Sequence, residues 1–232
     1  MPLLSTSEKE PAPAGITMKL YYSPFSSNSR KVRLAAAELG ATLELVHINI
    51  VTGAQRAPDY LALNPMGRVP LLDDGGFLLS ESSAIMMYLA DASHGDALYP
   101  REVRPRADVN RWLFWGAGHW GPTIAALAFE NMLKSLLRIG EPDAAQVKRH
   151  EEALLALGGV IDAHLQSRDF LLGSTLSIAD LAIAAPLMLS VAAKLPLRSF
   201  TNLQAWFDRI QLRDSWKATE PPTLPPGAGS SR

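Results

Sequence analysis

The chain has 232 residues, of which 47% are hydrophobic, enough for one large globular domain or two smaller ones. Its 22 basic and 23 acidic residues give a formal net charge of −1, so no basic surface is predicted and nucleic acid is excluded as a partner. The absence of cysteine excludes disulfides, cysteine-ligated metals and a cysteine nucleophile.

Residues 18–94 alternate between strand-like and helix-like patterns. The apolar positions of 28–39 fall on one helical face, and Gly40 is a typical helix stop. The order β-α-β-α-β-β-α predicts a small mixed sheet with helices on its faces. The strands are expected at 18–22, 43–50, 69–72 and 77–79, and the helices at 28–39, 57–63 and 83–92.

Residues 95–106 are predicted to be a linker, because Pro100 and Pro105 interrupt the pattern. Residues 107–217 carry no strand signal, and helices are expected at 107–139, 143–166, 177–194 and 202–212. The first of these is expected to bend at its glycines, between Gly116 and Pro122. Ser177 and Asp180 have capping-box spacing, which favours a structural role for Asp180 over catalysis.

The segments 1–17 and 218–232 are rich in proline and serine and are predicted to be disordered tails. Residues 1–17 lack the basic start and apolar core of a signal peptide. The longest apolar stretch, 178–195, contains Asp180, Pro186 and Lys194, so we interpret it as a buried helix and not as a membrane span. A cytoplasmic protein with no membrane partner is expected.

The segment around Pro70 and Glu81 has the features of a ligand site. A proline turn at Val69-Pro70 lies close in sequence to a predicted helix that begins with Glu81 and Ser82. The free N–H groups of a helix start and the Ser82 hydroxyl suit a carboxylate, and Glu81 can accept a hydrogen bond from an ammonium. The segment can therefore hold a small zwitterionic peptide. The plainer interpretation is a capped helix that follows a hairpin.

Three motifs resemble those of the soluble glutathione transferases. The run from Asn64 to Pro70 resembles the family's N-P-x-x-x-V-P segment, whose last proline is cis. Glu81-Ser82 resembles its acidic-serine pair, and Ser177–Asp180 resembles its helix-capping motif. The resemblance spans about residues 18–217. It implies a thioredoxin-like α/β N-terminal domain joined to an all-α-helical C-terminal domain, with glutathione as co-substrate and a homodimeric assembly.

Such an enzyme must ionise the thiol of glutathione. An ordinary thiol has a pKa of about 8.5, and ionising it at neutral pH requires about 2.7 kcal/mol of preferential stabilisation. One hydroxyl donating to the thiolate supplies about 1.5–3 kcal/mol, and a helix N-terminus adds about 0.3–1 kcal/mol. A single hydroxyl at the start of the first helix is therefore sufficient.

The resemblance places Ser26 where serine-type members have the activating hydroxyl. Ser27 falls where a bacterial class has its cysteine, and Tyr22 is the tyrosine-type alternative. Helix capping by serines, and core packing of Tyr22, are the structural alternatives. The resemblance also places Gln55 against the glycyl end of glutathione, with Val69 and Pro70 along its backbone.

An apolar electrophile is expected to bind beside Trp112, Trp115 and His119, which share one helical face. The resemblance puts this helix next to the sulfur. Alternatively, the tryptophans pack between helices and His119 is a partly buried structural histidine. The five histidines show no metal-ligand spacing, so no metal is expected.

The leading hypothesis is a glutathione S-transferase that conjugates the thiolate to apolar electrophiles. A non-catalytic glutathione or ligand carrier of the same fold is the alternative from another class. A glutathione-dependent isomerase or peroxidase is a third possibility. Against the isomerase, Asn28 stands where the isomerase-like class has a cysteine.

Overall fold

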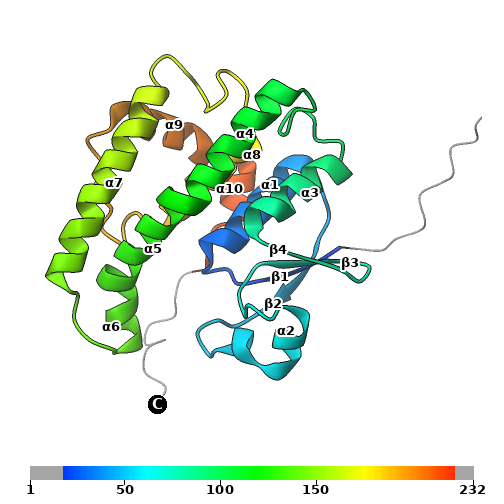
Figure 1. Ribbon diagram of the computed structural model, residues 1–232, viewed down its shortest axis with the longest axis horizontal. Helices are drawn as coiled ribbons and strands as arrows, with labels where there is room; N and C mark the ends of the chain where they lie inside the picture. Colours follow the sequence, from blue (N-terminus) through cyan, green and yellow to red (C-terminus); the bar gives the residue numbers. More distant parts are fainter. Residues whose placement is uncertain (1–17, 223–232) are drawn as a thin grey trace, which may run out of the picture.

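The computed structural model describes residues 18–222. The predicted tail 1–17, and residues 223–232 of the other predicted tail, lie outside the described residues. Figure 1 shows a small sheet with α1 and α3 over one face and α2 beyond the other, beside a larger group of helices that begins with α4. The predicted combination of a thioredoxin-like α/β part and an all-helical part is confirmed.

The sheet has four strands in the order β2-β1-β3-β4. Strand β1 pairs in parallel with β2, and the β1–β3 and β3–β4 pairs are antiparallel. The predicted element order and mixed sheet are confirmed. The strands are β1 Lys19–Tyr22, β2 Glu44–His47, β3 Leu71–Asp74 and β4 Phe77–Ser80.

One strand is shorter than expected, and another is displaced along the chain. The predicted strand 43–50 ends at His47, because the Asn49 side chain accepts hydrogen bonds from the N–H groups of Val51 and Thr52 and turns the chain. The predicted strand 69–72 begins only at Leu71. Pro70 has no N–H to donate to a ladder, and it follows a cis peptide bond.

The helices of the first part are α1 Ser27–Leu39, α2 Pro58–Leu63 and α3 Ser82–Ala92, with a 3₁₀ turn η1 at Ala54–Arg56. Gly40 ends α1 in the left-handed conformation, with φ 64°, and its N–H bonds to the carbonyls of the last turn. The predicted stop is confirmed, because glycine adopts this conformation without a steric penalty.

The first helix of the second part begins at Val103, inside the segment expected to be a linker. Pro105 lies in its first turn, where no N–H is needed. The helix runs through α4 Val103–Trp115, α5 Gly121–Ala128 and α6 Lys134–Leu137. Two π-helical turns, η2 Gly116–Trp120 and η3 Phe129–Leu133, join these pieces, and η2 lies where a bend was predicted.

The remaining helices are α7 Ala144–His164, α8 Ile178–Ala184, α9 Thr201–Gln211 and α10 Asp214–Ala218. The predicted helix 177–194 was too long. Its α-helical part ends at Ala184 and continues as the 3₁₀ turn η4 Ala185–Leu189, because Pro186 cannot donate the next helical hydrogen bond. Helix α10 was not predicted, and Thr219 is buried although it was assigned to a disordered tail.

Asp180 has the structural role that its spacing predicts. Its carboxylate is fully buried and accepts hydrogen bonds from the N–H groups of Leu171 and Ser177, at 2.8 and 2.9 Å, and from the Trp206 indole at 3.0 Å. The capping box is present. Within residues 18–222, no helix combines the length and the apolar character needed to cross a bilayer.

Helix α1 lies at the junction of the two parts. It packs against α3 on one side and against α8, η4 and α10 on the other. The starts of α1 and α3 both lie next to the loop that precedes β3.

Candidate functional site

One pocket lies where the loop before β3 meets the starts of α1 and α3. It gathers four of the residues predicted to bind a ligand, which the sequence spreads over two motifs. Its lining is formed by Asn28, Asn64, Met66, Arg68, Val69, Pro70, Ser80, Glu81 and Ser82.

The loop is held so that Val69 stays outside the sheet. The Arg68 carbonyl accepts hydrogen bonds from the Asn64 amide at 2.8 Å and from the Tyr60 hydroxyl at 2.7 Å. The Val69-Pro70 peptide bond is cis, as the resemblance implies. Because β3 begins only at Leu71, the peptide groups of Val69 are available to pair with an extended ligand.

The start of α3 has an unusual backbone. Glu81 precedes the helix with φ 68° and ψ 112°, and its side chain makes no capping hydrogen bond. A non-glycine residue in such a region costs about 1–3 kcal/mol, and such residues cluster at ligand sites. Ser82 is buried, and its hydroxyl lies 3.5 Å from Asn28 Oδ1. The first N–H groups of α3 and the Ser82 hydroxyl thus meet at the pocket.

Lys31 adds a buried positive charge to this region, and the sequence reasoning missed it. It lies on α1, three residues after Asn28, and is only 3% exposed. None of the ion pairs described within residues 18–222 includes it. Burial lowers the pKa of Lys31 to about 8, and the charge of Glu81 opposes this shift. Lys31 shares its helix face with Asn28 and Glu38 as well as with Leu34 and Ala35, so the sequence pattern did not mark it as buried.

The two candidate serines stand at the start of α1. Ser26 is the N-cap, and its oxygen accepts a hydrogen bond from the Ser29 N–H at 3.2 Å. Capping by Ser26 is therefore present, and it leaves the hydroxyl hydrogen free to be donated. Ser27 is the first helical residue, and both serines are half-buried. Asn28, which follows them, lines the pocket.

Tyr22 is partly buried and packs against the edge of the hydrophobic core. Its ring lies 5.9 Å from the His47 ring and 5.2 Å from the Arg33 guanidinium carbon.

Gln55 lies in η1, against the loop that carries Val69. Its side-chain oxygen is buried and has no hydrogen-bond partner among the described residues. Gly67, in the same loop, has φ +57°, and a Cβ added there would lie 2.9 Å from the Gln55 carbonyl oxygen. The turn and the loop therefore pack backbone against backbone.

The aromatic residues of the second part separate into core and surface. Trp112 is 1% exposed and packs edge-on against Trp115, with the His164 ring 4.8 Å away, so its side chain is part of the core. Trp115 is half-buried, and His119 is exposed, contrary to the partly buried alternative. Phe114, which the sequence reasoning passed over, is a strongly exposed aromatic residue on the same helix.

In the part of the chain that the structure describes, no group of three or more His, Asp or Glu side chains could hold a metal ion.

Comparisons with known protein families match both parts of the chain. Residues 16–91 match the glutathione S-transferase N-terminal domain, and residues 121–214 match the C-terminal domain. Glutathione S-transferase 3 of Zea mays is 36% identical over 220 residues, which cover 92% of this chain and 98% of that protein. Human glutathione S-transferase theta-2B is 32% identical over 197 residues, 84% of this chain and 80% of that protein.

Solved structures agree with these matches. A glutathione S-transferase-I bound with lactoylglutathione superimposes with a TM-score of 0.78 at 28% identity, covering 88% of this chain and 98% of that one. A delta-class glutathione transferase of Nilaparvata lugens gives a TM-score of 0.75 at 31% identity, covering 92% and 95%.

The contact between Gly67 and η1 gives a test of the loop. Gly67→Ala is expected to lower the free energy of unfolding by about 2–4 kcal/mol, because a left-handed alanine costs about 1–2 kcal/mol and the added methyl overlaps a carbonyl oxygen. Gly40→Ala is the matched control, since Gly40 has φ +64° with nothing within 4 Å of the new Cβ. Urea unfolding measures both, and equal losses would contradict the packing argument.

Proposed function

The chain belongs to the glutathione S-transferase family, and we propose how its pocket binds glutathione and which hydroxyl activates the thiol. It is a glutathione transferase that uses glutathione as co-substrate. The observation that carries the proposal is the single pocket in which Val69, Pro70, Glu81 and Ser82 meet.

Glutathione binds with its backbone along Val69, whose peptide N–H and C=O pair with it like an added strand. Its γ-glutamyl carboxylate lies at the start of α3, against the free N–H groups and the Ser82 hydroxyl. Its ammonium donates to Glu81, and its glycyl end extends towards Gln55. The buried charge of Lys31 supports this arrangement, because it supplies positive potential at a place where the protein provides no ion-pair partner among the described residues.

Ser26 activates the sulfur, and Ser27 is the alternative. The Ser26 oxygen accepts from the Ser29 N–H, which orients the hydroxyl while its hydrogen remains available for a thiolate. The start of α1 adds the favourable potential of a helix N-terminus. The thiol proton leaves to solvent, and the thiolate then forms a C–S bond to the electrophilic carbon while the leaving group departs. An apolar electrophile is held by the helical half, where Trp115 and His119 are the candidate contacts.

Ser26→Ala and Ser27→Ala decide between the two hydroxyls. The variant that removes the activator is expected to lose about 10²-fold in turnover of an aryl halide, because the thiolate loses its main donor. Glutathione affinity, measured by calorimetry, should change little in either variant. Wild-type rates in both variants would remove the serine assignment. A wild-type protein that binds glutathione but turns over no electrophile in a broad panel would favour the alternative function, a non-catalytic glutathione carrier.

Lys31→Met separates ligand binding from stability. The variant is expected to raise the KM for glutathione about tenfold, because the γ-glutamyl carboxylate of glutathione loses the positive charge of Lys31. It should also unfold at a higher temperature at pH 7, since it removes a buried charge. The pKa of Lys31 is lowered to about 8 from an unfolded value of about 10.4, so this cost to folding is complete below pH 8. The thermal advantage of the variant should therefore shrink as the pH rises from about 8 to about 10.

The assignment requires that Lys31→Met binds glutathione more weakly and yet unfolds at a higher temperature. A less stable variant with an unchanged KM for glutathione would show that Lys31 acts through the packing of its stem alone.

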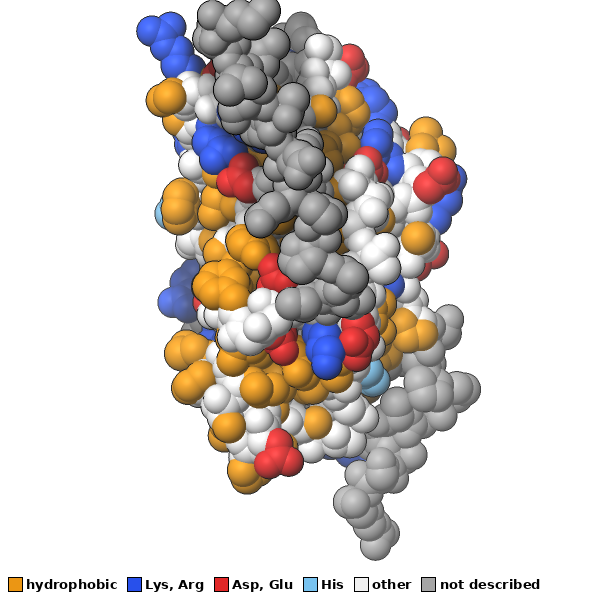
Figure 2. All heavy atoms as spheres, turned by 90° about the vertical axis from the view of Figure 1, so that its right-hand side faces the viewer, with side chains coloured by type: hydrophobic (Ala, Val, Ile, Leu, Met, Phe, Trp, Pro, Cys, Tyr) orange, Lys and Arg blue, Asp and Glu red, His pale blue; other side chains and the backbone are white. Residues whose placement is uncertain are grey.

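The assembly is proposed to be a homodimer that uses the face carrying α3 and the β3–β4 turn. Phe77 is 52% exposed beside Tyr88, and Leu78 is exposed as well. Figure 2 shows hydrophobic side chains gathered on this face among scattered charges. Exposed apolar clusters of this kind are typical of subunit interfaces. The cytoplasmic location stays a prediction from the sequence.

Light scattering is expected to give a mass near twice the 25.2 kDa of one chain. Phe77→Asp should convert the protein to a monomer, because it places a charge in the apolar contact. Val191→Asp is the control, since Val191 is 84% exposed but lies beyond η4 in the helical half. A monomeric wild-type protein at micromolar concentration would refute the dimer.

A further inference from the structure

The last described segment of the chain lies along α1 and binds it near the candidate serines. Arg30 is 2% exposed and stacks on the Trp216 ring, with its guanidinium carbon 3.7 Å from the ring centre. The same guanidinium donates to the Trp216 carbonyl at 2.9 Å and to the Thr219 hydroxyl at 3.4 Å. Thr219 is itself buried. These three residues are called the Arg30 clasp.

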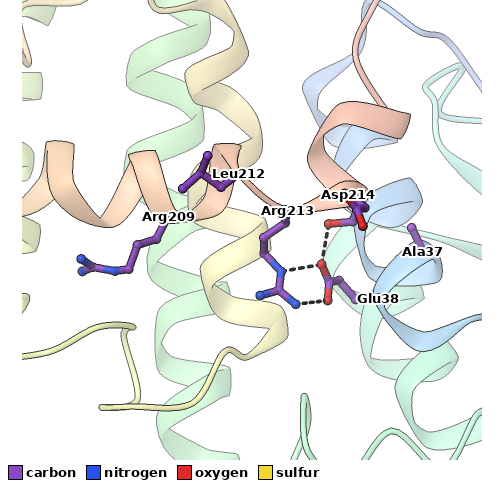
Figure 3. A pocket seen from close by; sticks show the side chains of 7 residues that line it. Ala37, Glu38, Arg209, Leu212, Arg213 and Asp214 are labelled. Atoms are coloured by element: carbon purple, nitrogen blue, oxygen red, sulfur yellow. Dashed lines mark hydrogen bonds and ion pairs between the residues drawn. The ribbon is translucent and has the colours of Figure 1, made fainter.

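A second attachment joins the same segment to the far end of α1. Arg213 donates from Nε and from Nη2 to the two Glu38 carboxylate oxygens, each at 2.6 Å, and the Ser215 hydroxyl also donates to Glu38. Figure 3 shows Arg213 and Glu38 facing each other across the junction, while Arg209 points away. This attachment is called the Glu38 pair.

The Arg30 clasp holds a cation without an ion pair. Burial lowers the pKa of Arg30 to about 10, although Glu220 opposes the shift, and Arg33 is a further positive charge nearby. A carbonyl and a hydroxyl accept hydrogen bonds from two of the guanidinium nitrogens, and the indole face adds a cation–π contact. The fit of a planar fork to these three groups explains an arginine at this position.

Arg30 is tied to the serines through the first turn of α1. Its backbone N–H donates to the Ser26 carbonyl at 2.9 Å, which closes that turn. The backbone of Ser26 is therefore connected directly to the residue that the C-terminal segment holds. A shift of the Arg30 side chain is transmitted to the start of the helix with few intervening bonds.

We propose that the C-terminal segment fixes the geometry of thiol activation, with Arg30 as a positioning residue that holds the Ser26 and Ser27 hydroxyls against the sulfur of glutathione. The proposal rests on the proposed function, namely that a hydroxyl at the start of α1 ionises the thiol. It assigns a role in the N-terminal site to residues near the C-terminus of the chain.

The two attachments provide a matched comparison. Both join the same segment to the same helix, so both contribute to stability. Glu38 lies twelve residues after Ser26, about 18 Å along a helix at about 1.5 Å per residue. Only the Arg30 clasp lies next to the serines. Only its loss should therefore change the apparent pKa of the bound thiol.

The experiment measures the pH dependence of turnover and the glutathione affinity of Arg30→Lys, Trp216→Leu and Glu38→Gln in the full chain. Arg30→Lys keeps the charge and loses the fork and the stacking. It is expected to raise the apparent pKa of the bound thiol by about 1, which lowers turnover about tenfold at low pH, while the calorimetric Kd for glutathione changes less than twofold. Trp216→Leu should act in the same direction, and it serves as the test if Arg30→Lys does not fold. Glu38→Gln should lower the unfolding midpoint and leave the pH profile unchanged.

A pH profile that stays in place in the folded clasp variants would overturn the proposal, as would an equal shift in Glu38→Gln. The serine variants separate this failure from that of the proposed function. If Ser26→Ala or Ser27→Ala raises the thiol pKa and the clasp variants do not, only the clasp is wrong. If neither serine variant raises it, thiol activation at α1 is wrong as well.

Discussion

The packing of α1 on both sides is the constraint on which the rest of this structure depends. One side of the helix lies against α3, and the other lies against α8, η4 and α10. Because successive helical residues point in different directions, neighbouring positions of α1 serve different partners. Asn28 reaches Ser82 at the pocket, Arg30 reaches the C-terminal segment, and Glu38 closes the far end. A helix held in this way can keep its first turn at a fixed distance from a ligand bound at α3.

Two energetically unfavourable features lie beside the pocket. Glu81 has a strained backbone, and Lys31 is buried without an ion-pair partner among the described residues. Elsewhere, a buried charge such as Asp180 receives several hydrogen bonds. Burying a charge without compensation is costly, so its presence at one site indicates that a ligand completes the arrangement. A bound glutathione would thus add stability as well as substrate, through preferential binding to the folded state.

Much of the fold was predictable, because local signals and tertiary packing agree. The stop at Gly40, the capping box at Ser177 and the proline turn at Pro70 each act within a few residues and appear as expected. The misses needed information from distant parts of the chain. Helix α10 is short and polar, and it is stabilised by Arg30, some 190 positions earlier. The burial of Lys31 and of Trp112 likewise depends on which helix face meets its neighbour, which periodicity alone does not determine.

The absence of cysteine limits what this site can do with a thiolate. A cysteine thiolate at such a site can attack glutathione disulfide, forming a mixed disulfide and releasing one glutathione thiolate. A serine hydroxyl can only donate a hydrogen bond to the thiolate, and it forms no bond that must later be broken. In the proposed function, the ionised sulfur attacks an electrophile held by the helical half. The composition, the hydroxyls at the start of α1 and the family's transferase activity therefore point to the same chemistry.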